Sequence, residues 1–314
     1  MIKLFNIENY NIDMKKFSHI LHDECVTKFE NTIADYVGAK YACGVNSATN
    51  AIFLSMLNKD VTVNIPSMIP AVVPNALLTS GNSINFIDDT EWVGDSYTLH
   101  DFGDYKIIDS AQKIEKDQYK NEANDSDIMI FSFYPTKPIG SIDGGMVVSN
   151  DEEKINWFRE ATLNGMSFAT DNWERKIKFP GYKMYLNSVQ AYVANENFKK
   201  YESKLANLNR IRKIYNSEFG LSNTSNHLYR VPIIDSTASE KSAALRELNI
   251  ASGIHYECLH KHATYAREKF EFGYTHNSLP KSDAAAGRVL SIPFHEKLSD
   301  EEINRVIEGT LPSL

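Results

Sequence analysis

One lysine, Lys137, stands in the glycine- and proline-rich stretch FSFYPTKPIGSIDGG, directly after a short apolar run. A second apolar run, upstream in YKIIDSAQ, ends in Asp109 and is followed by Gln112. A lysine amine forms a Schiff base with an aldehyde, and a carboxylate can hold a pyridine nitrogen protonated so that the ring accepts electrons. If both residues follow neighbouring strands, the pair predicts pyridoxal phosphate (PLP) chemistry.

A cofactor with a phosphate also needs an anion site, and the segment NSATN at residues 46–50 offers one between a predicted strand and a predicted helix. The first amides of a helix have no partner within it and attract anions. Ser47 and Thr49 add hydroxyl donors, and Ser132 can donate to the same group. Taken singly, such residues are more often helix caps, polar strand residues or solvated lysines, so it is their combination that favours a site.

Other motifs give weaker signals. No GxGxxG follows a strand and no GxxxxGK[ST] occurs, so neither a dinucleotide site nor a P-loop is predicted. His260 and His262 lack an acid or cysteine arranged around them, so we predict no metal and treat His260 as a surface or substrate contact. Gly144 and Gly145 indicate either a plain turn or a backbone that passes close to the cofactor or to another subunit.

The elements that must position these residues follow from the hydrophobic pattern. Strands alternate with helices in the first half of the chain, which predicts an α/β domain with a mostly parallel central sheet and flanking helices. Ligands of such sheets bind beyond the carboxyl ends of the strands. The longest helical pattern, about residues 187–218, is expected to link this domain to a smaller C-terminal α+β domain. We predict a large domain at residues 1–205 and a small domain at 206–314.

Composition narrows the class of protein. The chain has 314 residues and a net charge of −8, which argues against nucleic acid and anionic membranes as partners. Its three cysteines are scattered, without a CxxC pair, and are expected to be free thiols. The N-terminus has no signal-peptide pattern, and the apolar runs are too short to cross a bilayer. These features predict a cytoplasmic protein.

Several segments together resemble one family, the nucleotide-sugar aminotransferases of the DegT/StrS type, which are PLP-dependent and have the aspartate-aminotransferase fold (fold type I). The most specific match is the lysine block, FSFYPTKPIGSIDGGMVVSND. The segments IIDSAQ and FENTIADYVGAKYACGVNSATNAIFLSML resemble the family's Asp-x-Ala-Gln element and its N-terminal block. Further matches are GYKMYLNSVQAYVA, SGIHYECLHKHATY and VLSIPFHEKLSDEEINRVIE.

The resemblance implies a role for each matching residue. Lys137 would hold PLP as a Schiff base and then shuttle the proton, and Asp109 would pair with the pyridine nitrogen. Gln112 would lie near the phenolic oxygen of the ring or near the substrate. Ala48, Thr49 and Ser132 would hold the phosphate, with Ser47 as a further donor at the helix start. Where the family has other residue types, Met68 or Ile69 would cover the ring face in place of an aromatic residue, and Lys183 would reach the phosphate. The predicted substrate contacts are Tyr134, Tyr185 and His260.

One segment is shorter than in the family. The family inserts a strand and a helix before the Asp-x-Ala-Gln element, and here only TEWVGDSYTLHDFGD, residues 90–104, takes their place. We therefore expect a reduced sheet or an abbreviated crossover in the large domain.

The resemblance implies an enzyme that takes an amino group from glutamate and gives it to a keto sugar attached to a nucleotide. It also implies a homodimer in which both subunits build each site. Two alternatives remain open at this point. One is a non-catalytic relative that binds PLP or a sugar nucleotide as a sensor or scaffold. The other is a PLP-dependent sugar dehydratase, although such relatives replace the lysine with histidine and Lys137 is intact.

Overall fold

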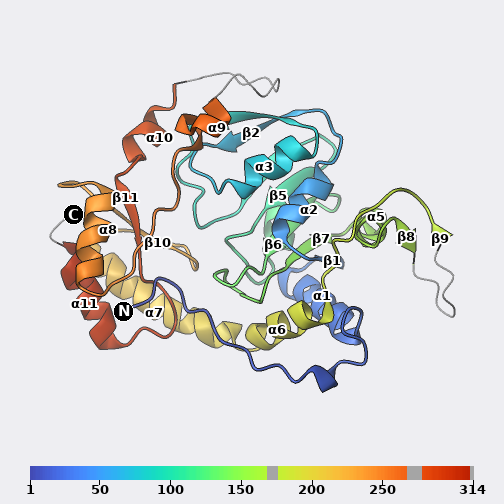
Figure 1. The fold of residues 1–314 in the computed structure, drawn as a ribbon, viewed down its shortest axis with the longest axis horizontal. Helices are drawn as coiled ribbons and strands as arrows, with labels where there is room; N and C mark the ends of the chain where they lie inside the picture. Colours follow the sequence, from blue (N-terminus) through green and yellow to red (C-terminus); the bar gives the residue numbers. More distant parts are fainter. Residues whose placement is uncertain (168–175, 267–277, 312–314) are drawn as a thin grey trace.

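A five-stranded sheet forms the centre of the protein, in the order β1-β7-β6-β5-β4 (Figure 1). Residues 1–167, 176–266 and 278–311 are described by a computed structural model. The strands of the central sheet are β1 Tyr41–Val45, β4 Tyr97–Asp101, β5 Lys106–Asp109, β6 Ile128–Ser132 and β7 Gly145–Ser149.

The directions of these strands are mixed. Strands β5 and β6 run parallel, whereas β1–β7, β7–β6 and β5–β4 are antiparallel pairs. The predicted α/β class is confirmed, but the central sheet is not mostly parallel as the sequence suggested. The connections explain the difference, because parallel neighbours need a crossover that is usually helical. Residues 102–105 join β4 to β5 directly, and residues 133–144 join β6 to β7 without a helix.

Helices cover both faces of this sheet, and the alternation of side chains along β6 shows why. Ile128 and Ile130 belong to the core under α2 and α5, whereas Met129 and Phe131 belong to the core under α1 and α6. Successive strand residues point to opposite faces, so a strand of apolar residues requires a cover on each side. The covering helices are α1 Glu24–Val37, α2 Ala48–Ser55, α5 Glu152–Thr162 and α6 Ser188–Phe198.

A separate parallel pair lies beside the sheet. Strands β2 Thr62–Pro66 and β3 Ser83–Ile87 are joined through α3 Val72–Thr79. After β3 the chain reaches β4 without a helix, and β4 turns back onto β5. Residues 90–104, where a shortened connection was expected, thus hold one antiparallel strand and turns.

The C-terminal part has its own apolar core, and Ile2 from the N-terminus joins it. Helix α7, Tyr201–Phe219, enters this core at Leu208, whereas Leu205 still packs against the core of the large domain. The predicted domain boundary at 205/206 falls at this change and stays a prediction. The expected long helix is divided at Lys199 and Lys200 into α6 and α7. The other elements of this core are α8 Ala238–Glu247, α11 Asp300–Thr310, β10 Tyr229–Pro232 and β11 Val289–Ile292.

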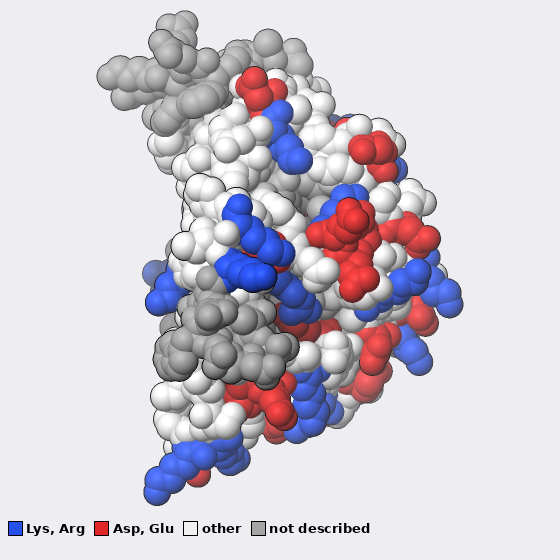
Figure 2. All heavy atoms as spheres, turned by 90° about the vertical axis from the view of Figure 1, so that its right-hand side faces the viewer, with Lys and Arg blue, Asp and Glu red and all other residues white. Residues whose placement is uncertain are grey.

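The remaining elements are short. They are α4 Gln118–Glu122, α9 Ala263–Ala266, α10 Pro280–Ala285, β8 Met166–Ser167, β9 Lys176–Ile177 and the 3-10 turns η1 Met14–Lys16 and η2 Leu259–Lys261. Among the described helices, none has the length and apolarity to traverse a bilayer. Figure 2 shows the face at the right of Figure 1, where basic and acidic side chains are interspersed.

Candidate active site

A cavity of about 470 Å³ opens at the ends of β5 and β6, beside the start of α2. It is lined from three directions: by the central sheet, by the loops after β2 and β3, and by segments near the C-terminal core. The residues that line it are Phe5, Ser47, Ala48, Thr49, Ile52, Pro70, Val72, Val73, Trp92, Asp95, Asp109, Ala111, Gln112, Ser132, Tyr134, Thr136, Lys137, Asp143, His227, His255 and Tyr256.

Asp109 is the last residue of β5, and only 4% of its surface is exposed. Its Oδ1 accepts a hydrogen bond from the amide of Ala111 at 2.9 Å, and its Oδ2 accepts one from the hydroxyl of Tyr97 at 2.9 Å. Burial raises the pKa of the Asp109 carboxyl, while these two donors and the charge of Lys137 act in the opposite direction. Asp109 is therefore a buried acid that is oriented by two donors and faces one cation.

Lys137 lies in the turn that follows β6, where its amide donates to the carbonyl of Tyr134 at 2.8 Å. Burial of the side chain lowers the pKa of its amine to about 8, and the charge of Asp109 opposes this shift. The structure thus brings Lys137 and Asp109 into the same cavity and couples their charges. A lysine with a lowered pKa has the neutral, nucleophilic amine that carbonyl chemistry requires.

This pKa gives a test on the apoprotein. The rate at which apoprotein captures PLP covalently is expected to rise with pH and to reach half its maximum near pH 8, because only the neutral Lys137 amine attacks. Stopped-flow absorbance at a series of pH values measures this rate. A rate that increases only near the ordinary lysine value of about 10.4 would contradict the assignment.

The start of α2 lines one end of the cavity. Ser47 caps the helix, its hydroxyl accepting from the amide of Asn50 at 3.2 Å, and Ala48 and Thr49 follow as the first helical residues. The Ser132 side chain lines the same cavity from the end of β6. Position 145 requires glycine for a steric reason, because a Cβ there would lie 2.6 Å from the nitrogen of Ala48. Its backbone passes close to the start of α2.

These residues fit PLP. A buried acid, a lysine of lowered pKa and the first residues of a helix line one cavity. They match the pyridine nitrogen, the aldehyde and the phosphate of that molecule in chemical type.

The ring-face prediction needs correction. Met68 and Ile69 are each 1% exposed and are not among the residues that line the cavity. The aromatic residues on its wall include Trp92 and Tyr256, whose rings stack at 6.1 Å with an interplanar angle of 10°. The indole nitrogen of Trp92 donates to the carbonyl of Met68 at 3.1 Å. Met68 therefore supports the indole through its backbone, and its side chain lies in the core.

Gln112 lines the cavity, and its side chain is hydrogen-bonded at both ends. Its Oε1 accepts from the amide of Gly94 at 2.8 Å, and its Nε2 donates to the hydroxyl of Tyr256 at 3.0 Å. Gln112 thus ties the shortened segment to the loop that contains Tyr256.

Three other predicted contacts lie away from this cavity. Lys183 is exposed, at a backbone bridge with Leu163. Tyr185 lines a different cavity, of about 330 Å³, and its ring lies 4.5 Å from that of His22. His260 is not a surface residue as one expectation had it, because it is 5% exposed.

The ring of His260 contacts two polar side chains. Its Nδ1 lies 2.5 Å from the hydroxyl of Ser67, and its Nε2 lies 3.2 Å from Asp283 Oδ1. Ser67 is fully buried and follows β2, so these contacts join η2 to the end of β2 and to Asp283 of α10. Of the predicted substrate contacts, only Tyr134 lines the main cavity.

Two histidines of the cavity were not predicted. Burial lowers the pKa of His227 well below its usual range, and burial lowers that of His255 to about 4; the charge of Lys137 adds to both effects. Both imidazoles are therefore neutral at physiological pH. The ring of Phe5 stacks on His227 at 5.7 Å and meets His255 edge-on at 5.9 Å. The segment SGIHYEC contained His255, but nothing local pointed to His227 or Phe5.

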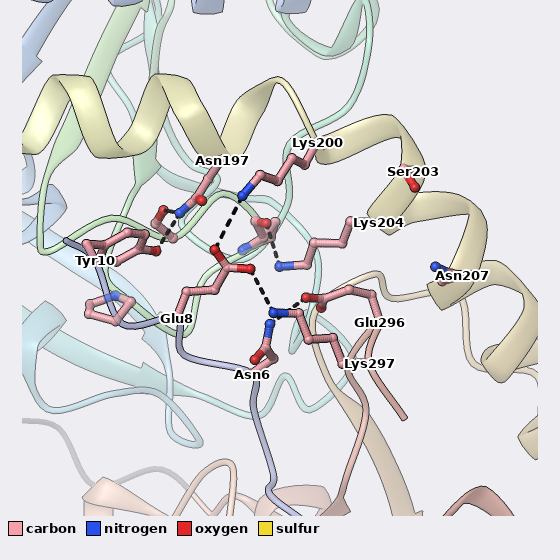
Figure 3. A pocket seen from close by; sticks show the side chains of 13 residues that line it. Asn6, Glu8, Tyr10, Asn197, Lys200, Ser203, Lys204, Asn207, Glu296 and Lys297 are labelled. Atoms are coloured by element: carbon pink, nitrogen blue, oxygen red, sulfur yellow. Dashed lines mark hydrogen bonds and ion pairs between the residues drawn. The ribbon is translucent and has the colours of Figure 1, made fainter. Parts of the chain in front are cut away.

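A second, polar pocket of about 150 Å³ lies behind the Lys137 turn (Figure 3). Glu8 from the N-terminal segment pairs there with Lys200 at 3.5 Å and with Lys297 at 2.9 Å. The amine of Lys204 donates to the carbonyl of Pro138 at 2.8 Å, and the amide of Asn197 donates to the carbonyl of Gly140. The start of α7 and the end of α6 thus hold the turn from behind.

Lys204 is expected to stabilise this turn. Lys204→Met keeps the apolar stem but removes the donor to Pro138, and we expect a loss of about 2 kcal/mol in the free energy of unfolding. Lys200→Met is the matched control, since that side chain is 66% exposed and its loss is expected to cost less than about 1 kcal/mol. Urea unfolding of both variants measures the difference. Equal losses would show that the hydrogen bond to Pro138 stabilises the protein no more than the exposed contact of Lys200 does.

The comparison with known proteins completes this picture. The model of the DegT/DnrJ/EryC1/StrS aminotransferase family matches residues 7–91 and 105–310 of the chain. A UDP-4-amino-4,6-dideoxy-N-acetyl-beta-L-altrosamine transaminase of Campylobacter jejuni is 25% identical, over 98% of this chain and 96% of its own.

Two solved structures share the fold. The aminotransferase TlmJ from Streptoalloteichus hindustanus has a TM-score of 0.79 at 19% identity, with 98% of this chain and 97% of that one covered. The putative sugar aminotransferase Spr1654 from Streptococcus pneumoniae, in its PLP form, has a TM-score of 0.77 at 19% identity, with 97% and 96% covered.

Proposed function

Because this chain belongs to the DegT/DnrJ/EryC1/StrS aminotransferase family, we propose that it transfers an amino group from glutamate to a keto sugar linked to a nucleotide, with PLP as cofactor. The observation that carries the proposal is the coupling of Lys137 and Asp109 in one cavity beside the start of α2. The Campylobacter jejuni relative is named for a UDP-linked amino sugar, which supports the acceptor class.

The residues of the cavity divide the work. When bound, PLP supplies an electron sink next to the reacting carbon and carries the amino group between the two half-reactions. Lys137 would hold the cofactor through its amine and, once displaced, move a proton at that nitrogen. Asp109 would keep the proton on the pyridine nitrogen, because an anion beside a base favours its charged form. Ser47, Thr49 and the first amides of α2 would hold the phosphate, together with Ser132.

The cavity has more acidic than basic side chains, which supports a contribution from a second subunit. Glutamate and nucleotide sugars are anions, yet among the described lining residues Lys137 is the one cation beside Asp95, Asp109 and Asp143. We propose that the protein is a homodimer and that Lys183 of the partner subunit supplies a further positive charge. The exposure of Lys183 on its own chain supports this role. The cytoplasm is the proposed location, since all three cysteines are free.

The two alternatives have less support. A sugar dehydratase would have histidine in place of Lys137, and the lysine is present with a lowered pKa. A sensor or scaffold has no need for a nucleophilic amine coupled to a buried acid, and the cavity contains both.

The proposed function is tested in two steps. Protein reconstituted with PLP should be yellow and should lose its visible absorption when glutamate is added. A panel of nucleotide-linked keto sugars, offered with glutamate and followed by mass spectrometry, should then yield one aminated product. Reconstituted protein that keeps its visible absorption with glutamate and aminates no sugar of the panel would support the binding-protein alternative.

A further inference from the structure

The segment that sets this chain apart from its family contributes a residue to the site. The family model does not match residues 92–104, and this segment contains β4. With no crossover helix among the described residues between β3 and β5, the chain folds β4 back antiparallel onto β5. The strand that carries Asp109 therefore has a neighbour whose residues are set by this hairpin.

The register of the hairpin places Tyr97 directly opposite Asp109. Directly opposed residues of an antiparallel pair project to the same face of the sheet, so their side chains meet. The Tyr97 hydroxyl donates to Asp109 Oδ2 at 2.9 Å, while the amide of Ala111 occupies Oδ1 at the same distance. Tyr97 is thus the side-chain donor that fixes the direction of this carboxylate.

Tyr97 is itself held in place by the cavity wall. Its ring meets the indole of Trp92 edge-on, with centroids 4.9 Å apart and an interplanar angle of 62°. The indole is anchored in turn by its bond to the Met68 carbonyl. One short segment therefore supplies both an aromatic wall and the donor to Asp109.

We propose that Tyr97 is a positioning residue, whose hydroxyl orients the Asp109 carboxylate and keeps it anionic opposite the cofactor's ring nitrogen. The inference rests on the proposed function for the identity of the cofactor, but the contact between Tyr97 and Asp109 does not.

The electrostatics of the pair agree with this role. The groups that face Asp109 are Tyr97 from β4, Lys137 from the turn after β6, and Tyr256 from the C-terminal part. Burial raises the pKa of Asp109, and the Tyr97 hydroxyl is one of the groups that counteract this effect. Burial, with the charge of Asp109, raises the pKa of Tyr97 far above its usual range, so this hydroxyl stays a neutral donor. Loss of the hydroxyl would therefore move the pKa of Asp109 further upward.

The first experiment uses the apoprotein, so it is independent of cofactor and substrate. Protein labelled with ¹³C at the aspartate carboxyls is titrated by NMR, and Asp109→Asn assigns the signal. In Tyr97→Phe the Asp109 signal should titrate at higher pH than in the wild type. Tyr256→Phe is the matched control, because it loses a hydroxyl from the same cavity that is bonded to Gln112. There the Asp109 titration should stay close to that of the wild type.

The second experiment uses protein reconstituted with PLP that carries ¹⁵N in its ring. In Tyr97→Phe, the ¹⁵N signal of the PLP ring nitrogen should shift toward the position of the unprotonated ring. The value of kcat should fall about ten- to a hundredfold, as expected for the loss of one hydrogen bond to a charged group, and KM should change little. A Tyr97→Phe protein with the Asp109 titration and ring signal of the wild type would overturn the inference, as would an equal shift of the Asp109 titration in Tyr256→Phe. Failure to bind PLP would defeat the proposed function, while the apoprotein titration would still decide the role of Tyr97.

Discussion

Replacement of Lys137 by alanine is expected to lower turnover by at least about 10⁴-fold, because the proton would lose its carrier and the cofactor its covalent anchor. The turn at position 137 is held by a backbone bond to the carbonyl of Tyr134, so Lys137→Ala should still fold and should still bind pyridoxamine phosphate. Single-turnover assays with glutamate measure the first effect, and equilibrium dialysis with pyridoxamine phosphate measures the second.

Lys106→Ala provides the control, since Lys106 lies at the start of the neighbouring strand β5 and its side chain is 41% exposed. This variant is expected to keep the activity of the wild type. Full activity in Lys137→Ala would refute the assignment of the lysine. Loss of both activity and pyridoxamine phosphate binding, with a normal fold by circular dichroism, would instead mean that Lys137 is needed to shape the cavity.

Replacement of Asp109 by asparagine should lower kcat by about 10²- to 10³-fold, the usual cost of removing one preorganised charge interaction at a reacting group. Asparagine keeps the shape of the side chain but cannot hold the ring nitrogen protonated. The wild-type carboxyl is buried and its pKa is raised, so activity should also fall as the pH drops through that pKa and Asp109 takes up a proton. Steady-state assays of both proteins over a pH series measure these effects.

Asp101→Asn is the matched control, because Asp101 ends β4 on the same hairpin and is exposed. It should leave both kcat and the pH profile unchanged. If Asp109→Asn kept the kcat of the wild type, the carboxylate would have no role in the electronics of the ring.

The core of the candidate site could be predicted from local sequence. Asp109 and Lys137 each follow an apolar run at a strand end, and Ser47 precedes an apolar helix. Strand ends and helix starts are encoded by neighbouring residues, so such positions can be inferred without knowledge of the tertiary fold. The structure places all of these residues on one cavity.

Packing between residues that are far apart in the sequence determined which side chains line the cavity. The family resemblance assigned the ring face to Met68 or Ile69, but both lie in the core, while Trp92 and Tyr256 line the cavity. His260 belongs to SGIHYECLHKHATY, a segment that resembles the family, but its two ring nitrogens contact Ser67 and Asp283. Residue type alone does not say which of several aromatic or imidazole side chains will face a ligand.

The sequence by itself determined which reactive groups the local elements carry: a lysine, an acid and a hydroxyl-rich helix start, each in a pattern that is complete within a few residues. Only the tertiary structure decided the direction of β4, and with it the contact of Tyr97 with Asp109. The physical reason is that a strand's direction and register depend on the length of its connections and on the partner that it meets, and a shift by one residue would have turned Tyr97 to the opposite face.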